Sequence, residues 1–420
     1  MKIAIIGSGI SGLSAALILS QKHQITIFEI NKRYGGHANT VQINNENTTI
    51  KVDTGFIVFN KLNYPNLVGF LKYLNVETIK SDMSFAVSAR DGELEYSGSL
   101  KGMFAQKKNY FNLKFYKMLK DIIRFFIFGY KYAFNVRENE NLKDYLNRCN
   151  FSDEFANDHL IPMSSAIWSC PEKEILTFPA KNLLTFFKNH QLINFLIRPK
   201  WRTVKGGSIQ YVKKVIKTLE QNKKNKLLLN TKISSITSKR KKIKIEYNHS
   251  YETFDKIIMA THPDQTLKLI KDLNKKTTDI LSKFRYQKNT VFLHSDPSMM
   301  PRNRKTWSSW NYLSNKNKKS STTYWMNQLQ DLNTSLNVFV SLNPFKIPNK
   351  SLIHKKIVYE HPIFNNSTNE AQKLINKIQG KDNIYYAGAW LGYGFHEDGI
   401  SSAIEISKYF DIKTPWIKNN

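Results

Sequence analysis

The chain has 420 residues, of which 41% are hydrophobic and 13% aromatic, enough for a sizeable core and too many for a disordered, collagenous or coiled-coil protein. A chain of this length predicts two lobes rather than one ordinary domain. Cys149 and Cys170 are the only cysteines, which excludes a disulfide framework, a cysteine-based zinc cluster and an iron–sulfur site and favours a reducing compartment.

The charge is unbalanced: 63 Lys and Arg residues stand against 33 Asp and Glu residues, and the formal net charge is +30. A positive field of this size favours anionic partners, either a nucleic acid or a membrane surface rich in acidic lipids. An AT-rich genome, which inflates lysine, asparagine and isoleucine together, explains the same numbers. The charge alone therefore identifies no partner.

Residues 3–19 carry no charge and imitate a signal peptide or a membrane span, but glycines and serines interrupt the run. A strand, a turn and a helix explain the spacing better. Lys2–Ile6 predicts a strand buried on both faces, Leu13–Gln21 a helix, and Gln24–Glu29 a second strand. We expect neither a signal peptide nor a membrane-spanning segment here.

The turn between the first strand and the helix is GSGISG, residues 7–12. In the order strand, glycine turn, helix, strand and acid, this motif predicts a dinucleotide site. Gly7 allows the tight turn, Gly9 lets the backbone approach a pyrophosphate, and Gly12 lets the helix pack closely on the strand. Glu29 is placed to bind the ribose hydroxyls, which disfavours NADP. The predicted contacts here are Gly7, Gly9, Ile10, Ser11, Gly12 and Glu29.

A second glycine motif, Gly35-Gly36, follows Glu29 after a few residues, and such a pair is typical of FAD proteins rather than NAD proteins. His37 directly follows the pair and is expected beside the flavin, without a covalent bond to it. We therefore predict that the cofactor is FAD, held in part by Gly35, Gly36 and His37.

With these motifs and the C-terminal segments 386–388 (YAG) and 397–399 (EDG), the sequence resembles the FAD-dependent amine-oxidase superfamily, which includes protoporphyrinogen oxidases and phytoene desaturases. Segments 35–40 (GGHANT), 53–60 (DTGFIVFN), 307–312 (WSSWNY), 323–330 (TYWMNQLQ) and 387–399 resemble a bacterial branch of predicted NAD/FAD-binding oxidoreductases more narrowly. Members of that branch often accompany cyclopropane-fatty-acid synthase-like methyltransferases.

The resemblance implies an α/β fold with a three-layer, Rossmann-type FAD-binding lobe and a mixed α+β substrate lobe. Residues 1–60, 201–284 and 371–420 would form the FAD-binding lobe, and residues 61–200 and 285–370 the substrate lobe. Further strands are expected at 226–236 and 242–247 as a pair, at 254–260 and at 383–387, with a helix at 401–409. Ile233, in the strand pair, is a further expected FAD contact.

The last strand and the helix after it carry a second expected contact with the flavin. In flavoproteins of this type Gly388 would approach the pyrophosphate or ribityl chain, and the helix N-terminus at Gly399 and Ile400 would face N1 and the C2 carbonyl. A helix N-terminus stabilises the negative charge that reduction places there. The superfamily usually has an acid after the first of these glycines, and here the residue is Ala389.

Candidate catalytic residues come from two places. Among His396, Glu397 and Asp398 one side chain is expected to face the flavin, and we nominate His396; three consecutive residues cannot converge on one metal ion, so no metal site is expected. Segments 307–312 and 324–327 alternate like neighbouring strands that cover the flavin, and they supply Trp310 and Tyr312. Residues 166–169 are expected to line the same cavity. Simple core packing is the alternative for each aromatic residue.

The stretch 101–134 combines eight Lys and Arg residues with eleven aromatic residues and one acid, Asp121. This composition suits an interfacial helix on a bilayer, with Phe125, Phe126 and Phe128 as anchors. A core helix with a lysine-rich solvated face explains it equally well.

Taken together, these features predict an FAD-dependent oxidoreductase that desaturates a lipid acyl chain, such as a methylated or unsaturated phospholipid chain. The alternatives left open are a flavin amine oxidase, a redox-neutral flavin-dependent lipid isomerase and a non-catalytic basic peripheral membrane flavoprotein. The expected partners are a lipid or small apolar substrate and an anionic membrane surface, with no nucleic acid; the oligomeric state is left open. The expected location is the cytoplasm, with peripheral attachment to the inner face of the cell membrane as a further option.

Overall fold

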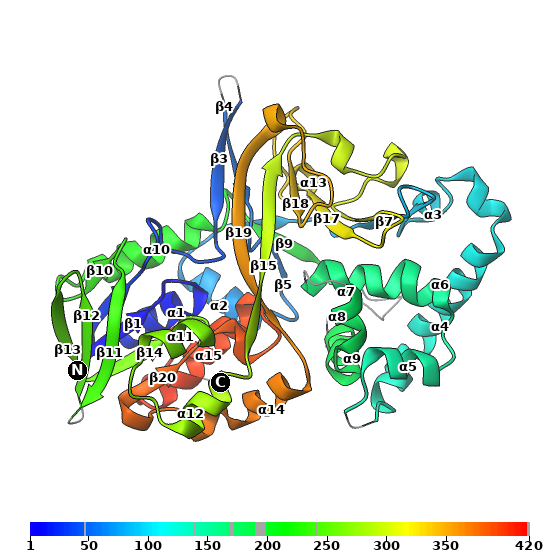
Figure 1. The fold of residues 1–420 in the computed structure, drawn as a ribbon. Helices are drawn as coiled ribbons and strands as arrows, with labels where there is room; N and C mark the ends of the chain where they lie inside the picture. Colours follow the sequence, from blue (N-terminus) through cyan, green and yellow to red (C-terminus); the bar gives the residue numbers. More distant parts are fainter. Residues whose placement is uncertain (46–47, 138, 169–171, 190–198, 240–241, 418–420) are drawn as a thin grey trace.

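A five-stranded parallel sheet forms the centre of the first lobe, at the left of Figure 1. The computed structural model describes residues 1–45, 48–137, 139–168, 172–189, 199–239 and 242–417, so Ser169 and Cys170 lie outside the described residues. The strand order is β10 (Lys226–Leu228), β2 (Gln24–Phe28), β1 (Lys2–Ile6), β14 (Lys256–Met259) and β20 (Ile384–Tyr386).

Both faces of this sheet are buried because successive side chains of each strand enter different cores. Ile3 and Ile5 of β1 pack with helices on one face, whereas Ala4 and Ile6 pack on the other. The first face is covered by α1 (Ile10–Leu19), α10 (Ile209–Glu220) and α15 (His396–Lys408). The second is covered by β11 (Ile233–Lys239), β12 (Lys242–Tyr247), β13 (Ser250–Phe254), α12 (Lys275–Leu281) and α14 (Asn366–Leu374). The predicted three-layer lobe is confirmed.

Several predicted elements of this lobe have different bounds. The helix predicted at Leu13–Gln21 is α1, Ile10–Leu19. Residues 226–236 are two strands, because the chain turns at Asn230 with φ of +51°; β10 joins the parallel sheet and β11 starts an antiparallel one. Residues 254–260 are also divided, between β13 and β14. The last helix begins at His396 instead of Ser401, because the Asp398 carboxylate accepts the Phe395 N–H at 2.8 Å and closes an earlier first turn.

The second lobe is built on a seven-stranded mixed sheet, and its two longest strands run side by side through the middle of the molecule (Figure 1). Trp310 lies directly opposite Tyr324, so the predicted pairing of the two aromatic segments is confirmed. The strand order is β19 (Ile353–Ile363), β15 (Arg285–His294), β18 (Phe339–Leu342), β17 (Ser320–Trp325), β16 (Trp310–Ser314), β7 (Phe85–Ala89) and β8 (Leu94–Ser97).

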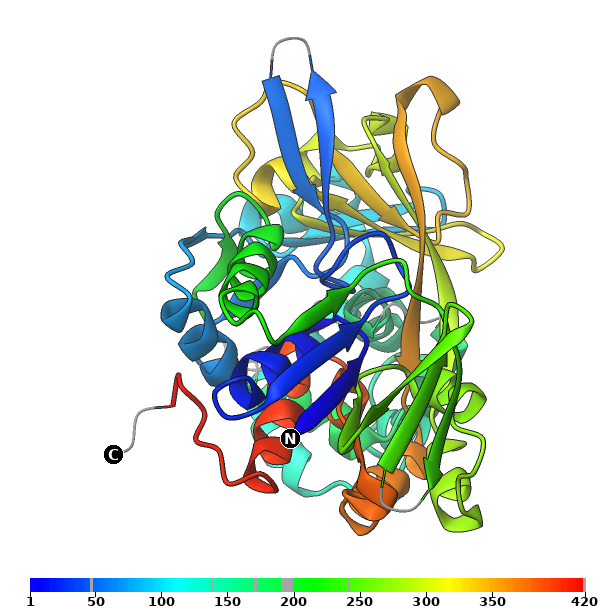
Figure 2. The same ribbon diagram turned by 90° about the vertical axis from the view of Figure 1, so that its left-hand side faces the viewer.

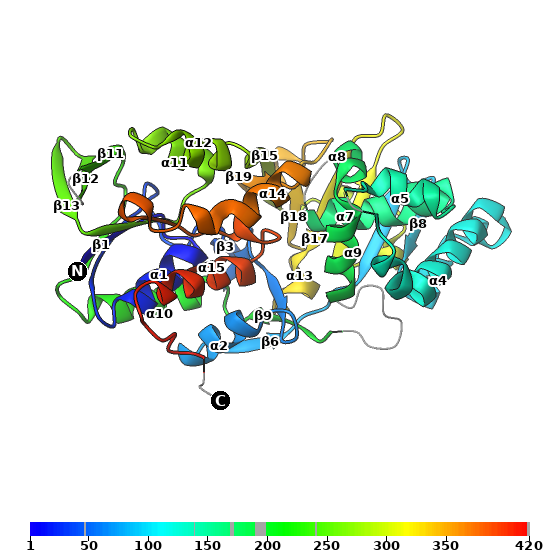
Figure 3. The same cartoon turned by 90° about the horizontal axis from the view of Figure 1, so that it is seen from below.

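A group of helices forms the far end of this lobe, opposite α1 and α15 in Figure 3. Its core contains Phe125, which is only 1% exposed and packs against Phe155 and Phe187. The expectation that Phe125 anchors the protein in a bilayer is therefore wrong, because this side chain belongs to the inner face of its helix. The helices are α3 (Leu100–Met103), α4 (Leu113–Phe134), α5 (Leu142–Arg148), α6 (Asp153–Phe155), α7 (Ile161–Trp168), α8 (Glu172–Thr177) and α9 (Ala180–Asn189).

Short elements connect the lobes. The hairpin of β3 (Thr40–Asn45) and β4 (Thr48–Asp53) projects at the top of Figure 2 and packs its apolar side chains on the seven-stranded sheet. Helix α2 lies in the interval expected for the substrate lobe, yet its Leu67, Phe70 and Leu71 pack in the core of the first lobe. The remaining connections are β5 (Val58–Asn60), α2 (Pro65–Tyr73), β6 (Thr78–Lys80), β9 (Trp201–Val204), α11 (Pro263–Leu269) and α13 (Met326–Leu329).

None of the described helices combines the length and the apolar content needed to cross a bilayer.

The two faces of the helical group generate a stability prediction. Phe125→Ala should lower the free energy of unfolding by about 3–5 kcal/mol, because it empties a closed aromatic core. Phe111→Ala, at a side chain that is 90% exposed, should change it by less than about 0.5 kcal/mol. Chemical denaturation of both variants measures the difference, and equal losses would contradict the assignment of inner and outer faces.

Candidate functional site

A cavity of about 1110 Å³ extends from the glycine turn after β1 to the aromatic strands of the second lobe. Its size suits a bound cofactor together with a small molecule. The first-lobe wall includes Gly7, Gly9, Ile10, Ser11, Glu29, Gly36, His37, Ile233, Gly388 and His396. The second-lobe wall includes Met83, Phe85, Met163, Ala166, Ile167, Trp168, Phe186, Trp310, Tyr324, Val340 and Leu342.

The glycine turn leaves open space where a phosphate would lie. A Cβ added to Gly9 would meet no atom within 4 Å, whereas a Cβ on Gly12 would lie 2.0 Å from the Gly7 carbonyl oxygen. Gly7 itself has φ of +99°, a conformation that favours glycine. Gly9 is the N-cap residue of α1 and has no side chain that could accept a hydrogen bond. The first N–H groups of α1 therefore have no side-chain acceptor at the N-cap and are available to an anion.

Two further backbone segments close around this helix start. A Cβ on Gly36, which has φ of +57°, would lie 2.9 Å from the Gly9 Cα atom. A Cβ on Gly399 would lie 2.7 Å from Ile10 Cγ2, so glycine lets the first turns of α1 and α15 touch. Gly35, with φ of +114°, forms the preceding turn and is not part of the cavity wall.

Glu29 is buried at the cavity wall, and four hydrogen bonds from two residues fix its carboxylate. Its Oε2 accepts the Ser8 N–H at 3.0 Å and the Ser8 hydroxyl at 2.5 Å, and its Oε1 accepts the Asn31 N–H at 2.9 Å and the Asn31 side-chain amide at 2.7 Å. These bonds hold the carboxylate between the glycine turn and the end of β2, the place where a ribose-binding acid is expected.

The contact predicted for the start of the last helix is displaced by one turn. The Gly399 N–H donates to the Phe395 carbonyl at 3.1 Å, so it is used inside α15, and Ile400 is fully buried in the core of the first lobe. The prediction that Gly399 and Ile400 offer their backbone to the flavin is wrong, since α15 begins at His396. The N–H groups of the first turn of α15, from His396 onwards, would instead be the ones offered to a flavin.

His396 lines the cavity as a buried, neutral imidazole. Its ring stacks on Phe56 with centroids 3.7 Å apart, and its Nε2 lies 3.0 Å from the Tyr211 hydroxyl. Burial lowers the pKa of His396 to about 3. The neighbouring acids have structural partners: Glu397 accepts the N–H groups of Asn66 and Leu67, which holds α2 against α15.

A histidine cluster beside the glycine pair was not expected from the sequence. The His37 ring lies 5.0 Å from Tyr359 and 5.3 Å from His361, both on β19, and all three line the cavity. Burial lowers the pKa of His37 well below its usual value and that of His361 to about 4. The only signal in the sequence is the alternation of Tyr359 and His361 on one face of a strand.

The two aromatic catalytic candidates lie in different surroundings. Trp310 and Tyr324 cross at 86° with centroids 4.8 Å apart, and both line the cavity. Tyr312 is 1% exposed, donates its hydroxyl to Glu172 and lies outside the cavity wall, because α7 and α8 cover this end of β16. The nomination of Tyr312 as a catalytic residue is therefore not supported by its position.

Two features fit the pyrophosphate and polar groups of FAD. The space beside Gly9 is open, since an added Cβ would meet no atom within 4 Å, and it lies at a helix N-terminus that favours anions. His37 Nε2, in the wall of the same cavity, is buried and has no hydrogen-bond partner among the described residues. A buried polar atom without a partner is costly unless a ligand satisfies it. Among the described residues, no group of three or more His, Cys, Asp or Glu side chains could hold a metal ion.

Comparison with known proteins supports the conclusion that this site holds a flavin. Residues 10–287, more than half of the chain, match the family model described as flavin containing amine oxidoreductase, and the chain belongs to that family. It is an FAD-dependent oxidoreductase with the amine-oxidase fold.

Solved structures share this fold at low sequence identity. A fatty acid isomerase from P. acnes that produces CLA is 15% identical with a TM-score of 0.68, and the alignment covers 97% of this chain and 98% of that one. The cyclohexylamine oxidase of Brevibacterium oxydans IH-35A is 12% identical with a TM-score of 0.68, over 98% and 99% of the two chains.

The chain also has a short match to a curated desaturase. It is 54% identical to the 4,4'-diapophytoene desaturase (4,4'-diaponeurosporene-forming) of Staphylococcus aureus over 43 residues. The match spans 10% of this chain and 9% of the desaturase. The similarity is therefore local and leaves the substrate open.

The two glycines of the turn give a matched pair of variants. Gly9→Val should yield a folded protein without the yellow colour of bound flavin, because its side chain occupies the open cradle. Gly12→Val should fail to fold, since its side chain meets the Gly7 carbonyl. Far-UV circular dichroism and the visible spectrum of both proteins check this, and a yellow Gly9→Val protein would place the pyrophosphate elsewhere.

Asp398 generates a pH prediction. Burial raises its pKa to about 7, so the native state holds this proton more tightly than the unfolded state. Its contribution is complete below about pH 4 and is lost as the pH rises to about 7, by up to about 1.4 kcal/mol per pH unit. Asp398→Asn keeps an acceptor for the Phe395 N–H and removes this dependence. The melting temperature of the wild type, relative to the variant, should therefore fall between about pH 4 and about pH 7; parallel curves would contradict the assignment.

Proposed function

We propose that the protein uses FAD to dehydrogenate the acyl chain of a lipid, leaving a carbon–carbon double bond. The observation that carries this proposal is the apolar second-lobe end of the cavity. A long hydrocarbon chain fits such a wall, whereas a charged substrate would need a partner there. The resemblance to a bacterial branch whose members accompany lipid-methylating enzymes agrees with a lipid substrate.

The apolar end is formed by side chains from several elements. Met163, Ile167 and Trp168 come from α7, Phe186 from α9, and Leu342 from β18. Among the described residues that line the cavity, the only carboxylates are Glu29 and Glu360. The first is fixed in the glycine turn and the second lies 3.4 Å from the Nδ1 atom of His262. Neither stands in the apolar end, so an ammonium group has no carboxylate partner there.

The chain's own contribution is orientation, dryness and a place for one proton. When bound, FAD would supply the oxidation, as the acceptor of a hydride from one substrate carbon and the donor of two electrons to dioxygen or another acceptor. The neighbouring carbon loses a proton, which completes the loss of two hydrogens from the chain. His37, His361 and His396 line the cavity and are neutral, because burial lowers each pKa. A neutral imidazole is the form that could accept this proton, and the same burial makes it a weak base. The apolar wall keeps water out.

A second candidate is oxidation of an amine. The crossed rings of Trp310 and Tyr324 resemble two sides of an aromatic cage, which attracts a cation. Oxidation of amines, with no oxidation of lipids, would support this candidate.

Anaerobic reduction of the flavin separates the candidates. The oxidised flavin band should disappear with a phospholipid that carries monounsaturated acyl chains and persist with putrescine or cyclohexylamine. Mass spectrometry of the lipid should show the loss of two hydrogens. If only amines bleach the flavin, the protein is an amine oxidase. If the lipid keeps its mass and its double bond moves, the protein is an isomerase. If no substrate reduces the flavin, the remaining alternative is a non-catalytic flavoprotein that binds a membrane.

The apolar end also gives a variant prediction. Met163→Trp should fill this end of the cavity and lower kcat/KM for flavin reduction by the lipid at least about tenfold, roughly 1.4 kcal/mol of transition-state stabilisation, with unchanged FAD content. Leu176→Trp is the matched control, because Leu176 is half-buried in the same helical group but outside the cavity wall. Equal kcat/KM values for the two variants would show that the substrate does not bind at this end of the cavity.

A further inference from the structure

An apolar surface covers the outer side of the helical group. Among the described residues, eight of the twenty exposed large hydrophobic side chains lie between residues 100 and 128, so exposure is concentrated there. Leu100 and Phe111 are each 90% exposed and Leu113 is 85% exposed. Such a cluster on a folded protein marks a surface that binds something. We call this surface, formed by Leu100, Tyr110, Phe111, Leu113, Tyr116, Ile123 and Ile127, the α3–α4 face.

The face continues along α4 as a stripe. Leu113, Tyr116, Lys120, Ile123 and Ile127 follow one another at intervals of four and three residues, which places them on one side of the helix. The opposite side holds Phe115, Met118, Ile122 and Phe125, all buried. Helix α4 therefore has two apolar sides, and its own core uses only one of them.

Lysines alternate along the chain with the apolar side chains of the α3–α4 face. Lys101, Lys107, Lys108, Lys114, Lys117 and Lys120 are all exposed, and no acid occurs between residues 100 and 120. Lys117 pairs with Glu154 at 3.1 Å, whereas the other five make no ion pair within the part of the chain that the structure describes. Exposed apolar side chains interspersed with lysines complement a bilayer with anionic headgroups: the apolar groups enter the acyl boundary and the ammonium groups stay with the phosphates.

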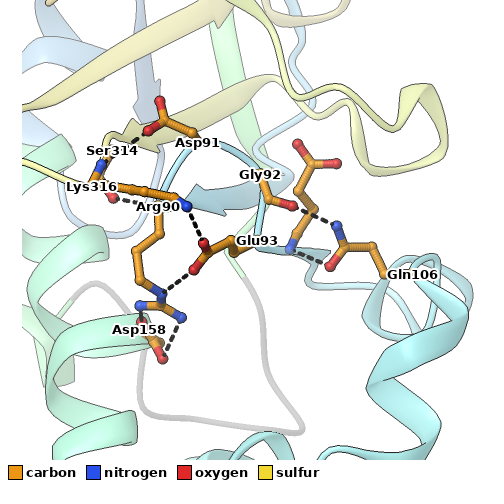
Figure 4. A network of polar contacts seen from close by, with 9 residues as sticks. Arg90, Asp91, Gly92, Glu93, Gln106, Asp158, Ser314 and Lys316 are labelled. Carbon is orange, nitrogen blue, oxygen red and sulfur yellow. Dashed lines mark hydrogen bonds and ion pairs between the residues drawn. The ribbon is translucent and has the colours of Figure 1, made fainter.

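A polar network holds the segment before α4 in one orientation, as Figure 4 shows. The Gln106 side chain donates to the Gly92 carbonyl at 2.9 Å and accepts the Glu95 N–H at 2.8 Å, which ties it to the β7–β8 turn. Arg90 of the same turn pairs with Asp158 at 2.5 Å. The exposed side chains are thus presented on a fixed support, and binding them need not order a loose segment.

The buried side of α4 links this surface to the cavity. Phe115, Met118 and Phe125 belong to the same apolar cluster as Trp168 and Phe186, and the last two line the cavity. The helical group that carries the α3–α4 face therefore also carries one wall of the proposed substrate site.

We propose that the α3–α4 face docks the protein on a bilayer rich in anionic phospholipid. This inference deepens the proposed function and rests on it, because the bilayer is then the source of the acyl substrate. A second copy of this chain is disfavoured as the occupant, since a two-fold contact through the face would bring its lysines together. The insertion involves Phe111 and Leu113 rather than Phe125.

Flotation with lipid vesicles tests the docking. The wild-type flavoprotein should bind vesicles of phosphatidylcholine with phosphatidylglycerol and bind vesicles of phosphatidylcholine alone at least about tenfold more weakly. Binding should fall as salt rises, because headgroup charges are screened within a Debye length of about 8 Å at physiological salt. Phe111→Ser/Leu113→Ser and Lys107→Gln/Lys108→Gln/Lys114→Gln should each weaken binding by about tenfold or more.

Matched controls remove similar groups elsewhere. Tyr251→Ser/Ile347→Ser replaces side chains that are each 65% exposed on other elements, and Lys223→Gln/Lys275→Gln/Lys276→Gln removes three exposed lysines of the first lobe. Both should bind like the wild type. Equal losses in the controls, equal binding to neutral vesicles or no binding to either kind would overturn the proposal. A dimer that Phe111→Ser/Leu113→Ser dissociates, without vesicle binding, would assign the face to a second copy.

The same lipid in detergent micelles separates docking from chemistry. If the proposal holds, Phe111→Ser/Leu113→Ser loses flavin reduction by lipid vesicles and keeps it with micelles. A wild-type protein that binds vesicles but is reduced in neither form keeps the docking surface and loses the proposed function. A wild-type protein that is reduced by micelles but does not bind vesicles keeps the proposed function and loses the docking surface.

Discussion

Close contact between backbone segments that carry no Cβ atoms is the constraint on which the site depends. Gly12 lets α1 lie against the glycine turn, Gly36 lets the next loop reach Gly9, and Gly399 lets α15 meet the start of α1. At Gly9 the same absence leaves open space instead of a contact. Two helix N-termini thus converge on one end of the cavity, where an anionic pyrophosphate and a reduced flavin would both be stabilised.

Burial supplies the second property of the site. The histidines at the cavity wall are neutral because their surroundings exclude water, and the same exclusion raises the pKa of the Asp53 carboxyl to about 6. Asp53 accepts hydrogen bonds from Ser208 and Gln330, so one buried carboxyl joins the β3–β4 hairpin to the start of α10 and to α13. The lobes are therefore held together by a group that is itself sensitive to pH.

Much of the first lobe could be predicted, since Lys2–Ile6, the glycine turn and Glu29 form a local pattern whose spacing dictates its geometry. The positions of Tyr359 and His361 could not, because they reach the cavity through the long-range pairing of β15 with β19. The start of α15 was missed because one side chain, Asp398, decides it. The predictions for Tyr312 and Phe125 were wrong for a common reason, because the surroundings of both side chains depend on which helices cover them. Periodicity in the sequence indicates which face of a strand or helix a residue lies on, but it does not indicate what packs against that face.

The proposed function requires that the bound flavin remove two hydrogens from an acyl chain. The most direct measurement is a single anaerobic turnover with a phospholipid whose acyl chains are fully deuterated, in which the flavin reduced and the lipid formed are quantified together. We expect one lipid that has lost two deuterium atoms for each flavin reduced. A lipid that keeps all its deuterium while the flavin is bleached, or that is rearranged without net reduction of the flavin, would contradict it.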